Sequence, residues 1–301
     1  MKRLVLAALS TTLLLAACGS DGDSSADTAA PADSTATTVA ISSGPADISN
    51  EPAACANGKT LAEGTLTIAT GDPAYFPYVI DDKPETGEGF EAAVALAVAE
   101  QLGFIGDTVT WVRTPFDTVI APGPKDFDFN LQQFTITDER KEAVDFSDGY
   151  YAAPQAVFGL ADSPAASATT IADLRSLKIG VAAGTTSVDY VESVIAPDSD
   201  ALIFNDNAAV KVALESKQID AVVTDLPTAI YITGVEIEGT TVFGQIEGSG
   251  GDEWGLLLAK DSPLTECVNL ALANLKDSGE LEQITTTWMS EFTGAPIITK
   301  E

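Results

Sequence analysis

Apolar and polar positions change between two periods along the chain after about residue 60. Residues 65–70 (TLTIAT) and 108–112 (TVTWV) have the pattern of strands. Between them, residues 90–102 (FEAAVALAVAEQL) carry apolar side chains at helical spacing, so we expect a helix there. Alternating strands and helices are typical of α/β domains with largely parallel sheets.

The alternation returns in the second half of the chain. It divides the chain into two α/β units at about 61–150 and 155–249, and the helices expected after them are too few for a third domain. In the second unit and beyond, we expect strands at 177–183, 201–204 and 220–224, and helices at 187–195, 208–217, 263–277 and 279–292.

The first residues have the composition of a targeting segment. Lys2 and Arg3 precede an apolar run at 4–15 that is too short to span a bilayer as a stable helix. The run ends in Leu-Ala-Ala-Cys, which resembles the bacterial lipobox. We therefore expect residues 1–17 to be a lipoprotein signal peptide and Cys18 to be lipidated; an ordinary secretory signal that contains a cysteine is the alternative.

Small and polar residues dominate the stretch from 18 to 58, which has no aromatic residue. Such a composition predicts a flexible tether, because it buries too little apolar surface to offset the entropy of ordering. Two further cysteines, Cys55 and Cys267, remain after Cys18. In an oxidising compartment a pair predicts a disulfide, with two free thiols as the alternative.

Charge and the missing residue types exclude several functions. The chain has 45 acidic and 15 basic residues and no histidine. The negative surface repels nucleic acids, and without histidine neither a Ser-His-Asp nor a Cys-His catalytic group can form. No glycine-rich phosphate loop follows a strand, so no cofactor is expected. Residues 126–130 (DFDFN) lack the glycine and distal glutamate of a calcium loop, and we expect a strand and no metal.

One arginine occupies an unusual position. In TITDERKEAV, Thr137 has the character of a helix N-cap, so Arg140 lies in the first turn, where a cation is disfavoured by the helix dipole. A residue that breaks a local rule is a candidate for function. The alternative is a simple ion pair with Asp138 or Asp145.

Further candidate residues follow the predicted strands, where α/β domains bind ligands. An arginine, an acid, hydroxyls at a helix start and aromatic rings together meet the requirements for a zwitterion. These candidates are Asp72 and Tyr75 after the strand at 65–70, Phe116 after 108–112, Thr185 and Thr186 after 177–183, and Asp225 after 220–224.

Five segments together resemble the family 3 solute-binding proteins of ABC importers, the polar amino-acid group. They are GTLTIAT with PAYFPY, TITDERKEAVDFSDGYY, VAAGTTSVDYV, DAVVTDLP and KDSGELEQITTTWM. The resemblance implies an α/β, two-lobe periplasmic-binding-protein-like (type II) fold with hinge strands near 150–154 and 250–254. Lobe 1 is then expected at 59–152 plus 252–301, and lobe 2 at 153–251.

The resemblance also assigns roles to individual residues. Arg140 corresponds to the arginine that binds the ligand α-carboxylate, and Thr135 contributes to the same grip. Thr185, with Thr186 beside it, is implied to contact the carboxylate from the second lobe. Asp225 is implied to hold the α-ammonium group.

The remaining candidates form the expected walls of the site. Tyr75 and Phe116 match the two stacking aromatics, and Asp72 matches a position that often contacts the ligand side chain. Gln133 departs from the family pattern, since Gln132-Gln133 stands where many relatives have Ala-Gly. Gln133 is therefore expected either to add a contact or to line the wall.

The implied function is that of an extracytoplasmic receptor and not of an enzyme. The chain is expected to act as a monomer, anchored by lipid to the extracytoplasmic face of the cell membrane, and to deliver an amino acid to a permease and its ATPase. Because Arg113 and Arg175 fall outside the matched positions, a neutral polar or cationic ligand is favoured over an acidic one. A small-carboxylate dehydratase-like enzyme on the same fold is the alternative.

Overall fold

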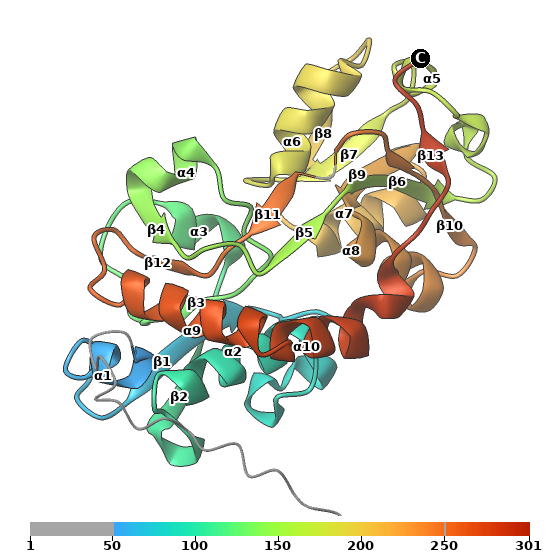
Figure 1. Cartoon of the computed structure of the whole chain (residues 1–301). Helices are drawn as coiled ribbons and strands as arrows, with labels where there is room; N and C mark the ends of the chain where they lie inside the picture. Colours follow the sequence, from blue (N-terminus) through green and yellow to red (C-terminus); the bar gives the residue numbers. More distant parts are fainter. Residues whose placement is uncertain (1–50, 250) are drawn as a thin grey trace, which may run out of the picture. The chain divides into compact units, whose positions relative to one another are not determined.

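The computed structural model describes residues 51–249 and 251–301, and Figure 1 shows their helices and strands. The expected signal peptide (1–17), the lipidation site Cys18 and the tether up to residue 50 lie outside the described residues. Within the described part, no helix has the length and apolar character needed to cross a membrane.

The first of the two main sheets forms the expected first lobe. Its central strand β1 (Leu66–Gly71) pairs in parallel with β2 (Val109–Thr114) and with β3 (Phe129–Asn130). Strand β12 (Leu257–Ala259) then inserts between β3 and β4 (Val144–Phe146), antiparallel to both. The sheet is therefore completed by a segment more than 100 residues further along the chain.

Helix α2 (Phe90–Gln101) provides the main buried face against this sheet. Gly89, which precedes it, has φ +109°, and a Cβ there would lie 2.5 Å from the Tyr78 carbonyl oxygen, so glycine is required. Helices α9 and α10 pack beside α2, as Figure 1 shows. The other helices of this lobe are α1 (Pro52–Ala56), α3 (Phe116–Ile120), α4 (Asp138–Ala143), α9 (Thr265–Asp277) and α10 (Glu280–Met289).

The second sheet has six strands in the order β13-β10-β6-β9-β7-β8. Strands β7, β8 and β9 are parallel, whereas β6 runs antiparallel to β9 and β10. The strands are β6 (Gln155–Leu160), β7 (Ile179–Ala182), β8 (Leu202–Phe204), β9 (Ala221–Asp225), β10 (Thr240–Ile246) and β13 (Ile297–Ile298).

The helices of the second lobe alternate with its parallel strands. The π-helical turns Val191–Ile195 and Ile232–Glu236 continue α6 and α8, so the helix expected at 187–195 is present with a change of pitch. The helices are α5 (Ile171–Leu174), α6 (Thr186–Tyr190), α7 (Asn207–Glu215) and α8 (Leu226–Tyr231). Short 3-10 helices lie at Ile80–Asp82, Pro84–Thr86, Gly106–Thr108, Pro164–Ser167 and Ser290–Phe292.

Two short strands connect the two sheets. Strand β5 (Tyr151–Ala153) pairs antiparallel with β11 (Asp252–Trp254), Tyr151 opposite Trp254. They occupy the positions where hinge strands were expected, and the predicted two-lobe fold is confirmed. The boundaries of the lobes stay predictions, with two exceptions at the ends of the described chain.

The first exception is the C-terminal end. Residues 252–301 were expected to belong wholly to lobe 1, but β13 pairs in parallel with β10 of the second sheet. Ile298 is buried in the second-lobe core, and the Thr299 carbonyl oxygen accepts a hydrogen bond from the Ile171 N–H. The chain therefore crosses between the lobes a third time after α10.

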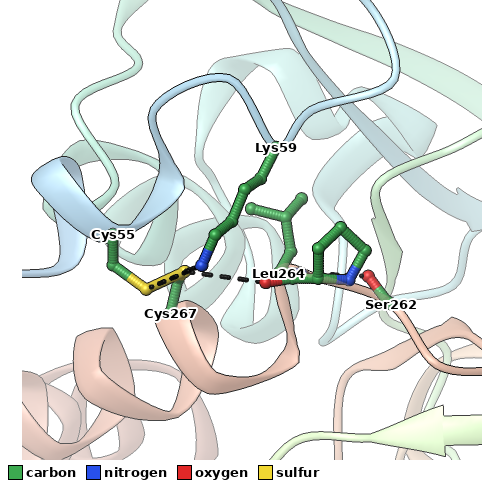
Figure 2. Close-up of a disulfide and its surroundings, with 6 residues drawn as sticks. Cys55, Lys59, Ser262, Leu264 and Cys267 are labelled. Carbon is green, nitrogen blue, oxygen red and sulfur yellow. Dashed lines mark hydrogen bonds between the residues drawn. A yellow bond between two sulfur atoms is a disulfide. The ribbon is translucent and has the colours of Figure 1, made fainter.

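The second exception is the end of the tether, which was expected to reach residue 58. Residues 52–56 instead form α1, with Ala56 fully buried against α9. The expected disulfide joins Cys55 to Cys267 in α9 (Figure 2). Lys59 Nζ lies 3.4 Å from the Cys267 Sγ atom and 3.5 Å from that of Cys55. The last part of the expected tether is thus a fixed part of the first lobe.

The DFDFN segment is a strand only at its end, in β3. Its Asp128 carboxylate accepts hydrogen bonds from two backbone N–H groups, Leu61 at 2.8 Å and Thr67 at 2.7 Å. This carboxylate therefore fixes the chain on the way into β1, which is a structural role.

Candidate functional site

A cavity of about 550 Å³ contains all of the sequence-predicted ligand residues in its lining. The first-lobe members lie after β1 and β2 and around α4, and the second-lobe members lie after β7 and β9. Parallel strands direct their carboxyl ends to one edge of a sheet, which brings these separate segments together. The predicted residues in the lining are Asp72, Tyr75, Phe116, Gln133, Thr135, Arg140, Thr185, Thr186 and Asp225.

Arg140 is held in place by backbone groups from both lobes. The Thr137 hydroxyl caps α4 by accepting the Arg140 N–H at 3.1 Å, as predicted. The guanidinium donates from Nη1 to the Thr135 carbonyl oxygen at 2.7 Å and from Nη2 to the Gly184 carbonyl oxygen at 2.9 Å. Its Cζ atom lies 5.8 Å from the centre of the Phe116 ring. These contacts fix the plane of the guanidinium at the cavity wall.

Arg140 does not form the ion pair with Asp138 or Asp145 that was the alternative explanation for its position. Asp138 pairs with Lys141 and Asp145 pairs with Lys260, each at 3.3 Å. Among the described residues, no carboxylate lies within 4.0 Å of the Arg140 guanidinium, although the side chain is only 8 % exposed. Burial lowers the pKa of Arg140, and the charges that oppose this lowering most are those of Asp189 and Asp252. A buried cation without a close anion is suited to an anionic ligand group.

Asp225 forms the opposite pole of the cavity. Burial, and then repulsion from Asp252, raises the pKa of Asp225 to about 7. Gln155, which is fully buried at the start of β6, donates from one amide nitrogen to Asp225 at 2.7 Å and to Asp252 at 2.9 Å. The Gln155 amide oxygen accepts from the Ser187 hydroxyl at 2.6 Å. The amide thus holds two carboxylates near each other, which favours a cation between or beside them.

Helix capping does not explain why Asp225 and Thr185 occupy their positions. Asp225 and Thr185 precede α8 and α6, but neither side chain accepts a capping hydrogen bond. The Thr185 hydroxyl instead donates to the Ala182 carbonyl oxygen at 2.8 Å. The Thr186 hydroxyl donates to Asp252 at 3.3 Å. The side-chain oxygens of Asp225, Thr185 and Thr186 can each still accept a hydrogen bond from a group in the cavity.

The rings of Phe116 and Tyr75 line the cavity, and each contacts a side chain outside the lining. Phe116 stacks on Phe134, with ring centres 4.8 Å apart. Lys211 of α7 lies over the Tyr75 ring, its Nζ atom 5.6 Å from the ring centre, and pairs with Glu236 at 2.7 Å. The rings are therefore held at defined positions in the wall.

Side chains of the two lobes meet around the cavity. The Tyr78 hydroxyl is 2.8 Å from the Thr228 hydroxyl, and the hydroxyls of Thr135 and Thr186 are 3.4 Å apart. The Phe76 ring stacks on Tyr231 of α8 with centres 4.7 Å apart. These contacts hold the lobes together across the site.

One functional candidate was missed. Glu91, in the first turn of α2, is 2 % exposed and lines the cavity. Burial raises its pKa to about 7, against the lowering effect of hydrogen bonds from Tyr150 and Gln133. It shares a buried helical face with Ala95, Val98 and Leu102, so the helical period places an acid among apolar positions, and this signal could have identified it.

Comparison with protein-family models identifies the family of this chain. The model for bacterial extracellular solute-binding proteins, family 3, matches residues 66–291. The chain belongs to this family. Family 3 solute-binding proteins and the relatives below carry the names of binding proteins, not of enzymes.

Individual relatives of this family 3 solute-binding protein are moderately similar over most of their length. A probable histidine-binding protein of Campylobacter jejuni is 27% identical over 235 residues, which are 75% of this chain and 88% of the relative. The arginine-binding extracellular protein ArtP of Bacillus subtilis is 30% identical over 213 residues, 68% of this chain and 78% of the relative. A solved structure of an ancestral arginine-binding protein bound to glutamine is 32% identical with a TM-score of 0.63, covering 75% of this chain and 98% of that one.

Proposed function

We propose that this family 3 protein is the extracytoplasmic substrate-binding component of an ABC importer and captures an amino acid with a cationic or neutral polar side chain. The observation that carries the proposal is Arg140, a buried guanidinium at the cavity wall with no carboxylate within 4.0 Å among the described residues. Its remaining N–H groups suit the planar, bidentate geometry of an α-carboxylate.

The other end of an amino acid fits Asp225. An α-ammonium group would neutralise this carboxylate, whose pKa is raised by burial and by repulsion from Asp252. Because Arg140 belongs to the first lobe and Asp225 to the second, a zwitterion that contacts both favours the closed arrangement of the lobes.

The charges in the cavity lining support a ligand with a cationic or neutral polar side chain. The lining contains five acidic side chains and a single basic one, Arg140. With one acid assigned to the ammonium group and one base to the carboxylate, the surplus is negative and disfavours an acidic ligand side chain. The names of the histidine- and arginine-binding relatives agree with this preference. The acids in the lining are Asp72, Glu91, Asp117, Asp206 and Asp225.

We assign the roles of the remaining partners from the family. The closed protein delivers its ligand to a membrane permease driven by an ATPase. The chain works as a monomer and is held at the membrane by lipid on Cys18. A Cys18→Ala chain that still sediments with membranes would contradict the anchor, and a dimer in light scattering at working concentration would contradict the monomer.

The test is isothermal titration of the purified chain against the common amino acids, after unfolding and refolding to remove co-purified ligand. We expect one-to-one binding of at least one cationic or neutral polar amino acid. Arg140→Ala should weaken that binding about 100-fold or more, because a buried charge pair loses one partner. Lys141→Ala is the matched control, since it removes the neighbouring cation of the same helix, which is exposed and outside the lining.

Normal binding by the Arg140→Ala chain would refute the carboxylate role. Absence of binding by the unaltered chain for every amino acid would refute the proposed ligand class.

A further inference from the structure

Glu91 is surrounded by hydrogen-bond donors, and most of them belong to one residue. Its carboxylate accepts from the Gln133 N–H at 2.7 Å, from the Gln133 side-chain amide and from the Tyr150 hydroxyl. Because Glu91 is almost fully buried, these donors are its main compensation for lost hydration. Gln133 therefore provides two of the three groups that satisfy this acid.

Gln133 occupies this position in an unfavourable backbone conformation. Its φ is +52°, in the left-handed region where glycine is preferred. A residue with a Cβ there costs about 1 kcal/mol relative to glycine. The local backbone would thus accept a glycine more readily than a glutamine, and the side-chain contact with Glu91 gives the glutamine a reason to be present.

Both residues line the ligand cavity, and their donor and acceptor groups face each other. One N–H of the Gln133 amide donates to Glu91, which leaves the second N–H and the amide oxygen for other partners. The carboxylate of Glu91 is in turn covered by Gln133, so it is not free to bind a ligand cation. Gln133 therefore supplies two of the donors around an acid in the first-lobe wall of the cavity.

We propose that Gln133 is a specificity-determining residue that masks Glu91, and so shifts the receptor away from long cationic side chains and toward shorter or uncharged ones. This inference rests on the proposed amino-acid binding at the same cavity. Without the Gln133 side chain, more of the Glu91 carboxylate would face the cavity, and the carboxylate would keep only the residue-133 N–H and the Tyr150 hydroxyl as donors. A guanidinium or ammonium at the end of a ligand side chain would then supply the missing donor.

The charge state of Glu91 affects the choice of conditions. Burial raises its pKa to about 7, and removal of a donor that favours the ionised form raises it further. Measurements at pH 8 or above therefore keep more of the carboxylate ionised. A ligand cation would also displace any proton that remains on it.

The experiment compares dissociation constants for arginine and glutamine in a set of four full chains: unaltered, Gln133→Gly, Glu91→Gln and the double variant. We expect Gln133→Gly to shift the ratio of the two constants about tenfold in favour of arginine, the size of one hydrogen bond to a charged group. The shift should vanish when Glu91 is glutamine. A Gln133→Ala chain keeps the left-handed strain and should show the same shift, which separates the side chain from the backbone.

Each outcome decides the inference. An unchanged ratio in Gln133→Gly overturns the masking role while leaving amino-acid binding intact. A shift that persists in the double variant overturns it as well, because cavity size alone would then be the cause. If the unaltered chain binds no amino acid at all, the proposed function fails and the inference fails with it. Thermal unfolding of each variant verifies that the chain is folded, and glycine at this φ is expected to be tolerated.

Discussion

The bridge between Cys55 and Cys267 allows a stability prediction to be worked out from the structure. It closes a loop with a sequence separation of 212 residues. In the chain-entropy model a loop of this length stabilises the folded state by about 5 kcal/mol, whereas measured disulfides more often contribute about 2–4 kcal/mol. For a chain of this size, the lower range corresponds to a fall of about 10 °C in the melting temperature when the bridge is lost.

Cys55→Ser is the appropriate change. Cys55 is only partly buried, whereas Cys267 is fully buried in the first-lobe core, so the substitution leaves the core side chain in place. Helix α1 has five residues, and besides the bridge it is attached through two buried residues, Pro52 and Ala56. Without the bridge, α1 should open before the rest of the lobe unfolds. Ligand affinity should not change, because neither α1 nor α9 contributes to the cavity lining.

The assay is calorimetric or optical melting with and without a reductant, together with hydrogen exchange over residues 51–58. Reduction should lower the melting temperature of the unaltered chain, and the melting temperature of the Cys55→Ser chain should not change with reductant. Equal melting temperatures for the two chains under oxidising conditions would refute the reasoning. A large loss of ligand affinity in Cys55→Ser would show that the bridge acts on the site as well.

Two more predictions concern the cavity and the contact between the lobes. A carboxyl whose pKa is raised to about 7, as for Asp225, binds a proton below that pH, so the ionised form that pairs with an ammonium group is lost as the pH falls. Ligand affinity should therefore fall by up to about tenfold per pH unit below 7, and the same fall is expected in a Glu91→Gln chain. Calorimetry in two buffers should detect the release of a proton on binding. A ligand affinity that stays constant from about pH 5.5 to 8 would contradict this prediction. Tyr231→Ala removes the ring that stacks on Phe76, and this stack lies outside the cavity lining. The unliganded protein should then be less closed, which X-ray scattering would detect as a larger radius. Ligand binding should weaken several-fold, because a smaller fraction of the protein is in the closed state. An unchanged radius and affinity would mean that the stack does not bias closure.

Local sequence patterns predicted the elements that depend on local physics. The helix at α2 and the strands β1, β7 and β9 lie within a few residues of their expected positions, because hydrophobic period and chain neighbours determine them. The patterns did not predict that β12 inserts between β3 and β4, or that β13 joins the second sheet. Pairings between distant segments leave no periodic signal in either partner.

The same division applies to the site. Arg140 stood out in the sequence as a cation at a helix start, but α4 ends at Ala143, so Arg140 also lies in its last turn, where the helix dipole favours a cation. The other ligand candidates came from strand ends and family motifs; they line one cavity, and their part in binding stays a prediction. The amide of Gln155, by contrast, donates to Asp225, 70 residues further along the chain, and to Asp252, 97 residues further along. Asp225 was identified from its place after a strand and from the family motif, whereas Asp252 is not unusual in so acidic a chain and only the folded arrangement distinguishes it.

The third crossing of the chain places the two ends of the described domain on different lobes. Glu51 precedes α1, which is bridged to α9 in the first lobe, while Glu301 follows β13 at the edge of the second sheet, and Figure 1 shows this end beside α5. Both residues are exposed. A donor fluorophore at position 51 and an acceptor at 301 would therefore move with opposite lobes, and their energy transfer would convert ligand capture directly into an optical signal.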